Sequence, residues 1–179
     1  MAVKVEYLPE YTYQDYLDWE GDWELIQGVP YAMAPAPTIK HQLISNALGH
    51  FLYQALERCE KCKSLIAADW KIDNETVVQP DNLVICHTPM HPNYLSQSPE
   101  LIFEILSPST AKKDQTLKFE LYEKEGVKFY VLVDPEEEVV KAYELKEGRY
   151  VIITSTHSDS LTFNLSECSV EIPFAKIWK

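Results

Sequence analysis

The sequence predicts an α/β domain in which a mixed β-sheet is flanked by helices, with a further helix and a hairpin near the N-terminus. Apolar residues recur at helical spacing over 39–58, and several apolar runs of strand length follow. A second helical pattern separates the run at 100–106 from the run at 128–134. Because a strand–helix–strand order forms a right-handed crossover, we expect these two strands to be parallel.

Size and composition predict a single domain, residues 1–179. Of the 179 residues, 46% are hydrophobic and 12% are aromatic. A chain of this length buries roughly 70% of its unfolded surface, which is enough for one core. A disordered acidic chain is excluded, because such chains lack apolar and aromatic residues.

The N-terminal third is predicted to form a helix, a hairpin and a long helix. Thr12 caps a helix that ends near Gly21. Strands at 23–26 and 29–33 flank a tight turn and form the hairpin. Thr38 begins the long amphipathic helix.

The remaining chain is predicted to alternate strands with one helix. Ser107 caps that helix, which runs to about residue 125, and the tail from residue 158 is weakly patterned. The strands are expected at 64–72, 76–86, 100–106, 128–134, 138–146 and 149–155.

The acidic charge restricts the possible partners. The chain has 16 basic and 28 acidic residues, a formal net charge of −12. Nucleic-acid binding depends mostly on contacts between cations and phosphates, so a DNA-binding function needs local positive charge. Lys112, Lys113 and Lys118 cluster on the predicted second helix and offer a limited source of it.

Several protein classes are excluded by what the sequence lacks. No apolar run approaches about 18 residues, so no membrane-crossing helix is expected. The N-terminal residues lack the pattern of a secretory signal, so a cytoplasmic location is expected. With only five glycines, the chain also lacks a glycine-rich phosphate-binding loop.

The four cysteines are expected to be reduced thiols. Cys59 and Cys62 form a C-x-x-C pair at the end of the long helix, whereas Cys86 and Cys168 lie in other elements. A structural zinc site needs four ligands, usually from a second such pair. A redox motif lies at the start of a helix, so neither role is assigned.

Two acids interrupt apolar strands and indicate a site. Asp81 shares a predicted strand face with Leu83, and Glu104 shares one with Ile102. A buried carboxylate is costly unless it is paired or binds a metal, and a shared Mg²⁺ would relieve the repulsion between two of them. The alternative is an acid at a strand end that faces solvent or accepts backbone hydrogen bonds.

Lys118 flanks the apolar stripe of the second helix, beside Leu117 and Leu121. From there its ammonium group could reach the end of the Glu104 strand. It would orient an attacking water or hold a phosphate oxygen. The alternative is a surface lysine whose stem packs on the protein while its charge stays in water.

These residues resemble the PD-(D/E)XK nuclease superfamily and, more narrowly, the Uma-type restriction endonuclease family. The resemblance rests on Pro80-Asp81, on the segment 104–110 and on Asp114-x-x-x-Lys118-x-x-x-Tyr122. Further matches lie at Trp23–Gly28, Ala34–Pro37, His41-Gln42, Ala68-Asp69 and Tyr130–Pro135.

The resemblance implies a restriction-endonuclease-like core that hydrolyses DNA phosphodiester bonds with Mg²⁺ or Mn²⁺. Asp81 and Glu104 occupy the metal-binding positions of the superfamily. Leu106 stands where the superfamily usually has its lysine, and Lys118 matches the helical lysine of the Uma-type family. Glu24 matches the early acid, which would complete the metal shell or orient a metal-bound water; its alternative is to face outward from the hairpin.

Two supporting residues are also predicted. His41 lies in the first turn of the long helix and would contact a phosphate or tune a carboxylate, unless it is simply a hydrogen-bonded, partly buried histidine. Asp69 is a weaker candidate. His87 and His91 are assigned to a solvated loop.

The leading hypothesis is an active metal-dependent endonuclease that cuts DNA and works as a homodimer, because cutting both strands usually needs two sites. The presence of Asp81, Glu104 and Lys118 favours it. The alternatives are a catalytically inactive nuclease fold that binds nucleic acid or a protein partner, and a hydrolase of another phosphate ester.

Overall fold

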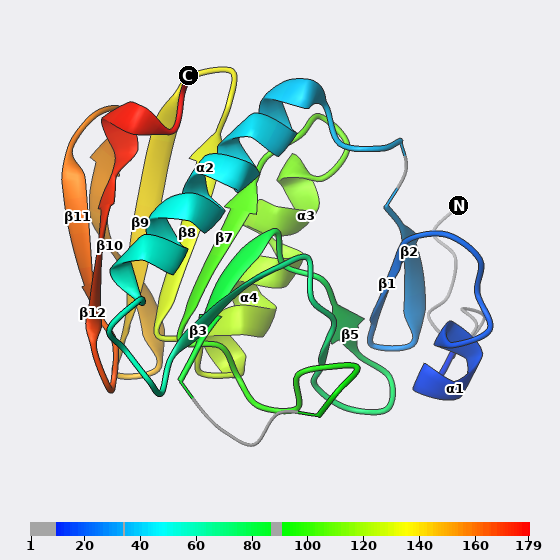
Figure 1. The fold of residues 1–179 in the computed structure, drawn as a ribbon. Helices are drawn as coiled ribbons and strands as arrows, with labels where there is room; N and C mark the ends of the chain where they lie inside the picture. The colour runs from blue at the N-terminus through cyan, green and yellow to red at the C-terminus, as the bar shows by residue number, and fades with distance from the viewer. Residues whose placement is uncertain (1–9, 34, 87–90) are drawn as a thin grey trace.

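The computed structural model describes residues 10–33, 35–86 and 91–179. A six-stranded sheet lies at its centre, with the strand order β10-β9-β8-β7-β6-β3 (Figure 1). As predicted, the sheet is mixed: β7 and β8 are parallel, and the other pairs are antiparallel. Its strands are β3 (Lys63–Ile66), β6 (Asn82–Ile85), β7 (Leu101–Ile105), β8 (Phe129–Asp134), β9 (Val139–Lys146) and β10 (Arg149–Thr156).

Two smaller sheets accompany the central one, with the orders β2-β1-β5-β4 and β11-β12. The predicted hairpin is confirmed as β1 and β2, whose two-residue turn places both Gln27 (φ 52°) and Gly28 (φ 74°) in the left-handed region, as hairpin turns of this length favour. The strands are β1 (Trp23–Ile26), β2 (Val29–Ala32), β4 (Trp70–Lys71), β5 (Val77–Val78), β11 (Ser160–Asn164) and β12 (Ser169–Pro173).

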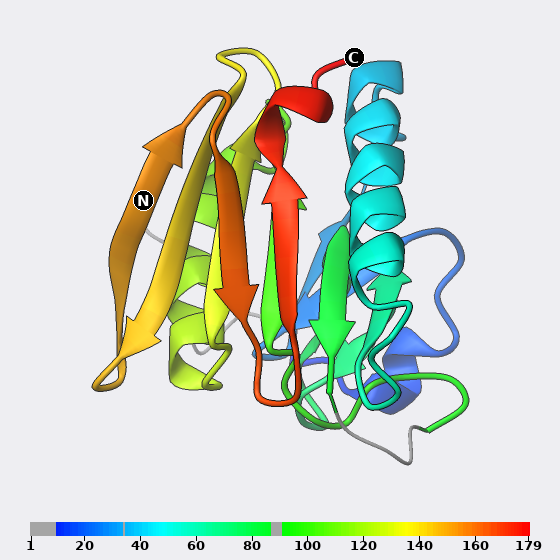
Figure 2. The ribbon, with the colours of Figure 1, turned by 60° about the vertical axis from the view of Figure 1, so that its left-hand side comes forward.

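Helices cover both faces of the central sheet (Figures 1 and 2). The long helix α2 lies on one face beside β11 and β12, and α3 and α4 lie on the other. None of the helices in the described ranges is long and apolar enough to cross a membrane. The helices are α1 (Tyr13–Tyr16), α2 (Ile39–Ala55), α3 (Ala111–Gln115), α4 (Leu117–Lys124) and the 3-10 turn η2 (Phe174–Lys176).

Alternation along β7 separates two hydrophobic cores. Phe103 and Ile105 pack into the core shared with α2, β11 and β12. Ile102 packs into the core shared with α4 and the four-stranded sheet. Because side chains alternate along a strand, Glu104 lies on the Ile102 side and enters the second core.

Two predicted strands are broken where the chain crosses between sheets. The run 76–86 splits into β5 and β6 at Pro80-Asp81, since proline has no N–H to donate to a ladder. The run 64–72 splits into β3 and β4 at Ala67, whose φ of 49° turns the chain. The Ala67 N–H donates to the Asp81 carbonyl over 3.1 Å, so the two breaks lie side by side.

The predicted helices are shorter than expected. α1 covers one turn only, and the second helix begins at Ala111, after a turn in which the Ala111 N–H donates to the Ser107 carbonyl over 2.9 Å. Thr116 leaves the helical region (φ −126°, ψ −78°) and divides this helix into α3 and α4. The expectation of a weakly patterned tail missed the hairpin of β11 and β12. In this hairpin Phe163 and Val170 are paired across the strands and both are fully buried.

The two faces of α2 predict opposite responses to truncation. Leu48 is fully buried in the first core, so Leu48→Ala should lower the free energy of unfolding by about 2–5 kcal/mol in urea titrations. Tyr53 is 74% exposed on the same helix, so Tyr53→Ala should change it by no more than about 0.5 kcal/mol. Equal losses would contradict the assignment of these faces.

Candidate active site

Asp81 lies at the bend that joins β5 to β6, where the two larger sheets meet. One of its oxygens, Oδ2, accepts the backbone N–H of Ile105 over 2.7 Å and lies 3.2 Å from Nε2 of His41. Ile105 directly follows Glu104 on β7. The backbone hydrogen bond therefore fixes Asp81 beside the second predicted acid.

Glu104 is 3% exposed and points from β7 toward α4. Its Oε1 accepts hydrogen bonds from Lys118 Nζ and from the Tyr122 hydroxyl, each over 2.8 Å. Both donors come from α4, four residues and one helical turn apart. The helical lysine thus reaches the carboxylate of the second acid, although Leu106, which directly follows β7, stands at the usual lysine position of the superfamily.

Glu24 is fully buried in β1 and faces the same cluster. Its Oε1 lies 2.7 Å from Lys118 Nζ and accepts the Gln79 backbone N–H over 2.9 Å, while its Oε2 pairs with Lys113. Lys118 therefore bridges Glu24 and Glu104. The alternatives of an outward-facing glutamate and a surface lysine are both wrong, because both side chains are buried.

Asp114 completes the cluster from α3. It is 2% exposed, and its Oδ1 lies 3.8 Å from Lys118 Nζ without a hydrogen bond from the described residues. The sequence resemblance included Asp114 but assigned it no role. Its i, i+4 spacing from Lys118 is the signal that could have indicated their contact. The contacts of Gln79 and Lys113 with Glu24 were not predicted.

The buried charges shift one another's protonation. Burial raises the pKa of Glu104 well above its usual range; Lys118 opposes this shift, and the nearby acids Asp114 and Asp81 add to it. Burial also raises the pKa of Asp114. These acids therefore gain a proton more readily than exposed carboxylates do.

Lys118 and Glu24 each stay charged because their partners carry the opposite charge. Burial disfavours the ammonium form of Lys118, yet Glu104, Glu24 and Asp114 together hold its pKa well above the ordinary value. Burial likewise opposes ionisation of Glu24, but Lys118 and Lys113 lower its pKa. Lys118 and Glu24 thus form a persistent ion pair.

His41 connects the start of α2 to Asp81. Its backbone N–H donates to the capping oxygen of Thr38 over 3.2 Å, and its side chain is 10% exposed. Burial disfavours the imidazolium, but the hydrogen bond and the charge of Asp81 raise the pKa of His41. The histidine therefore touches a predicted metal ligand, and it is also partly buried and hydrogen-bonded, as the plainer interpretation expected.

Asp69 lies behind the cluster and not within it. Its Oδ1 accepts the side-chain amide of Gln79 over 3.1 Å, and its Oδ2 accepts the Tyr16 hydroxyl over 3.0 Å. The backbone N–H of Gln79 in turn donates to Oε1 of Glu24, so Asp69 contacts the cluster only through Gln79. His91 stacks on Tyr94, and His87, like Ala34 of the family motif, lies outside the described residues.

The donor oxygens fit a divalent cation. No hydrogen bond from the described residues reaches Oδ1 of Asp81 or Oε2 of Glu104. Carboxylate oxygens are the ligands that Mg²⁺ prefers, together with water. Both oxygens of Glu24, by contrast, are already paired with lysines.

A family model matches most of the chain. The Uma2 family, described as "Putative restriction endonuclease", matches residues 13–172. This chain belongs to the Uma2 family. The family membership confirms the resemblance identified from the sequence motifs, and it makes this chain a member of a nuclease family.

A solved structure has the same fold as this Uma2-family chain. It is described as a "putative nuclease belonging to DUF820" from Anabaena variabilis, and it is 18% identical in sequence. The match covers 93% of this chain and 97% of that one, with a TM-score of 0.75. It supports the restriction-endonuclease-like fold. No curated protein matches the chain.

Removing the central ammonium should destabilise the protein. Lys118→Met leaves Glu24 and Glu104 buried without their shared cation, which should cost about 3–5 kcal/mol in the free energy of unfolding measured by urea titration. Lys112→Met makes the same chemical change at an exposed position of α3 and should cost no more than about 0.5 kcal/mol. Similar stability of both variants would show that Lys118 is not a structural counter-ion.

Proposed function

We propose that this Uma2-family chain is a divalent-metal-dependent nuclease that hydrolyses DNA phosphodiester bonds, with Mg²⁺ or Mn²⁺ held by Asp81 and Glu104. One observation carries the proposal: Asp81, at the bend before β6, is hydrogen-bonded to the backbone of Ile105, next to Glu104 on β7, and each acid keeps one oxygen without a hydrogen bond from the described residues. A cation bound there would stabilise negative charge that builds on the phosphate.

The raised pKa of Glu104 supports a cation at this position. Its raised pKa reflects burial and a surplus of neighbouring carboxylates. Four acids (Glu24, Asp81, Glu104 and Asp114) face two lysines and one histidine here. Added positive charge would favour the ionised form of Glu104 and so balance the cluster.

Lys118 acts on the reaction through Glu104. Its Nζ is engaged by two carboxylates and its side chain is 3% exposed, so it orients one oxygen of Glu104 and leaves the other free. Tyr122 donates to the same oxygen and reinforces that orientation. Glu24 holds Lys118 and Lys113, and we assign it this supporting role in preference to direct metal binding.

His41 and Lys113 are the other two basic residues of the proposed site. His41 can hold a proton on Nε2 and donate it to Oδ2 of Asp81, which keeps Oδ1 available. The Lys113 side chain is 13% exposed and its ammonium group pairs with the buried Glu24, so it neutralises that acid beside the site. With a net charge of −12 on the chain, we expect weak DNA affinity that falls steeply with added salt.

Cleavage of plasmid DNA tests the proposal. Asp81→Asn preserves the side-chain shape but removes the carboxylate charge, so Mg²⁺- or Mn²⁺-dependent cleavage should fall by at least about 100-fold. Asp18→Asn, at an exposed position outside the cluster, should cleave like the unmodified protein. A chelator should stop all cleavage.

Two results would contradict this assignment. Equal cleavage by the unmodified protein and Asp81→Asn would indicate a contaminating nuclease. Binding of DNA without cleavage by the unmodified protein, in either metal, would favour an inactive nuclease fold. If a symmetric homodimer supplies two sites, linear product should appear together with nicked product, and light scattering should report twice the chain mass of 20.7 kDa.

A further inference from the structure

All four cysteines of the chain gather at one place, although the sequence places them in three separate segments. Cys59 follows α2, Cys62 precedes β3, Cys86 follows β6, and Cys168 lies in the turn between β11 and β12. The structure joins Cys59 to Cys168 and Cys62 to Cys86 as disulfides. In this structure the expectation of reduced thiols is wrong, because the fold brings these segments together and their sulfurs are bonded.

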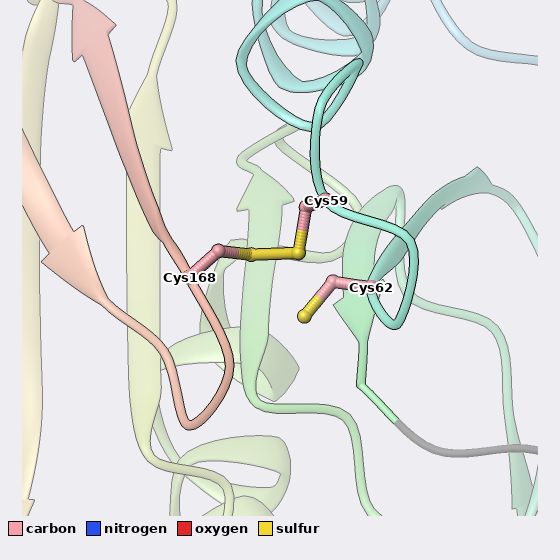
Figure 3. A group of neighbouring side chains, drawn as sticks. All are labelled: Cys59, Cys62 and Cys168. Carbon is pink, nitrogen blue, oxygen red and sulfur yellow. A yellow bond between two sulfur atoms is a disulfide. The ribbon is translucent and has the colours of Figure 1, made fainter.

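The two bridges form one cluster of sulfur atoms. The sulfurs of Cys59, Cys62 and Cys168 all lie within 4.8 Å of one another, and Figure 3 shows the Cys62 side chain pointing toward the Cys59–Cys168 pair. Cys86 is bonded to Cys62, but its sulfur is not one of those that all lie within 4.8 Å of one another, so it lies at the edge of this group. Three sulfurs from two separate segments thus converge with the fourth one bond away, as ligands of one metal ion do.

The backbone around the cluster is held by main-chain hydrogen bonds. Lys63 pairs with Ile85 in the β3–β6 ladder, which sets Cys62 opposite Cys86. The Leu165 N–H donates to the Cys168 carbonyl over 2.8 Å and shapes the turn that presents Cys168. The main chain around Cys62, Cys86 and Cys168 is thus held by hydrogen bonds in addition to the sulfur–sulfur bonds.

We propose that, in the reduced protein, these four cysteines bind one structural Zn²⁺ ion. Structural zinc sites are closed and tetrahedral, and four thiolates with one C-x-x-C pair are a usual ligand set. Cys59-Glu60-Lys61-Cys62 supplies that pair, and Cys86 and Cys168 supply the two remaining ligands. The second pair missing from the sequence is assembled by the fold.

Burial around the cluster suits a structural site. Cys62 is fully buried in the core beneath α2, and the other three cysteines are partly buried against it. The charges beside the cysteines balance: the cations Arg58, Lys61 and Lys63 lie among the acids Glu57, Glu60 and Glu167, and Lys61 pairs with Glu167 over 2.7 Å. The proposal therefore rests on the convergence and burial of the sulfurs and not on the local charge.

The bridged and zinc-bound forms are related by a balanced reaction. A dithiol reductant gives up two electrons for each disulfide that it opens and is itself oxidised to a cyclic disulfide, so two such molecules yield four cysteine thiols. Zinc then replaces the four thiol protons, and the ion itself undergoes no redox change.

This site is distinct from the proposed nuclease site. His41 lies at the first turn of α2, and Cys59 follows the other end of that 17-residue helix, which is about 25 Å long. Zinc at the cysteine cluster would tie the end of α2 to β3, β6 and the β11–β12 hairpin. The two sites can therefore be tested separately.

Metal analysis of the full chain, purified under a dithiol reductant, tests the proposal. The unmodified protein should carry about one zinc per chain, and Cys62→Ser should carry none. Asp81→Asn should keep its zinc, because it alters only the nuclease site. Zinc-free reduced protein, or zinc retained by Cys62→Ser, would overturn the proposal, and so would two disulfides that persist under the reductant.

A cobalt titration keeps the test decisive if Cys62→Ser fails to fold. Co²⁺ added to the reduced, zinc-free, unmodified protein should produce sulfur-to-cobalt charge-transfer bands and the intense visible bands of a tetrahedral site. Zinc should then displace the cobalt and remove these bands. A spectrum without charge-transfer bands would refute a thiolate site, whatever the outcome of the DNA cleavage assay.

Discussion

The buried ammonium group of Lys118 joins three parts of the fold that are distant in sequence. It comes from α4, and it contacts Glu24 on the N-terminal hairpin and Glu104 on the central sheet. Each of these carboxylates would be costly to bury alone, and together they stabilise the cation between them. The position of the hairpin against the central sheet therefore depends on a charge cluster as well as on apolar packing.

The same cluster bears on how an acidic protein could act on a phosphate, as we propose. Its lysines neutralise Glu24 and one oxygen of Glu104 from inside, and Asp81 is held by a backbone N–H and by His41. Oδ1 of Asp81 and Oε2 of Glu104 receive no hydrogen bond from the described part of the chain, and carboxylate oxygens call for a cation and not for more lysines. A metal would convert this acidic position into one that accepts a phosphate, so the overall charge of −12 does not exclude a nucleic-acid substrate.

Much of the fold could be predicted from the sequence, because periodicity records which face of an element is buried. The hairpin, α2, the parallel crossover from β7 to β8 and the burial of Glu104 all follow from local patterns. The breaks at Pro80-Asp81 and at Thr116 could not be predicted in this way. At the first the chain passes from one sheet to another, and at the second a helix restarts, and neither change alters the hydrophobic pattern. The β11–β12 hairpin was missed although its residues alternate as strand residues do, because each strand is only five residues long and turns two apolar side chains inward.

The candidate residues that sequence reasoning missed share one property: they are defined by contacts in space and not by spacing along the chain. Gln79 contacts Glu24 through its backbone N–H, which no side-chain motif can reveal. Cys86 and Cys168 are isolated in the sequence, and only the β3–β6 register and the β11–β12 turn bring them to the C-x-x-C pair. A lone C-x-x-C therefore neither establishes nor excludes a zinc site, because a sheet can supply the other two ligands from segments that carry no motif of their own.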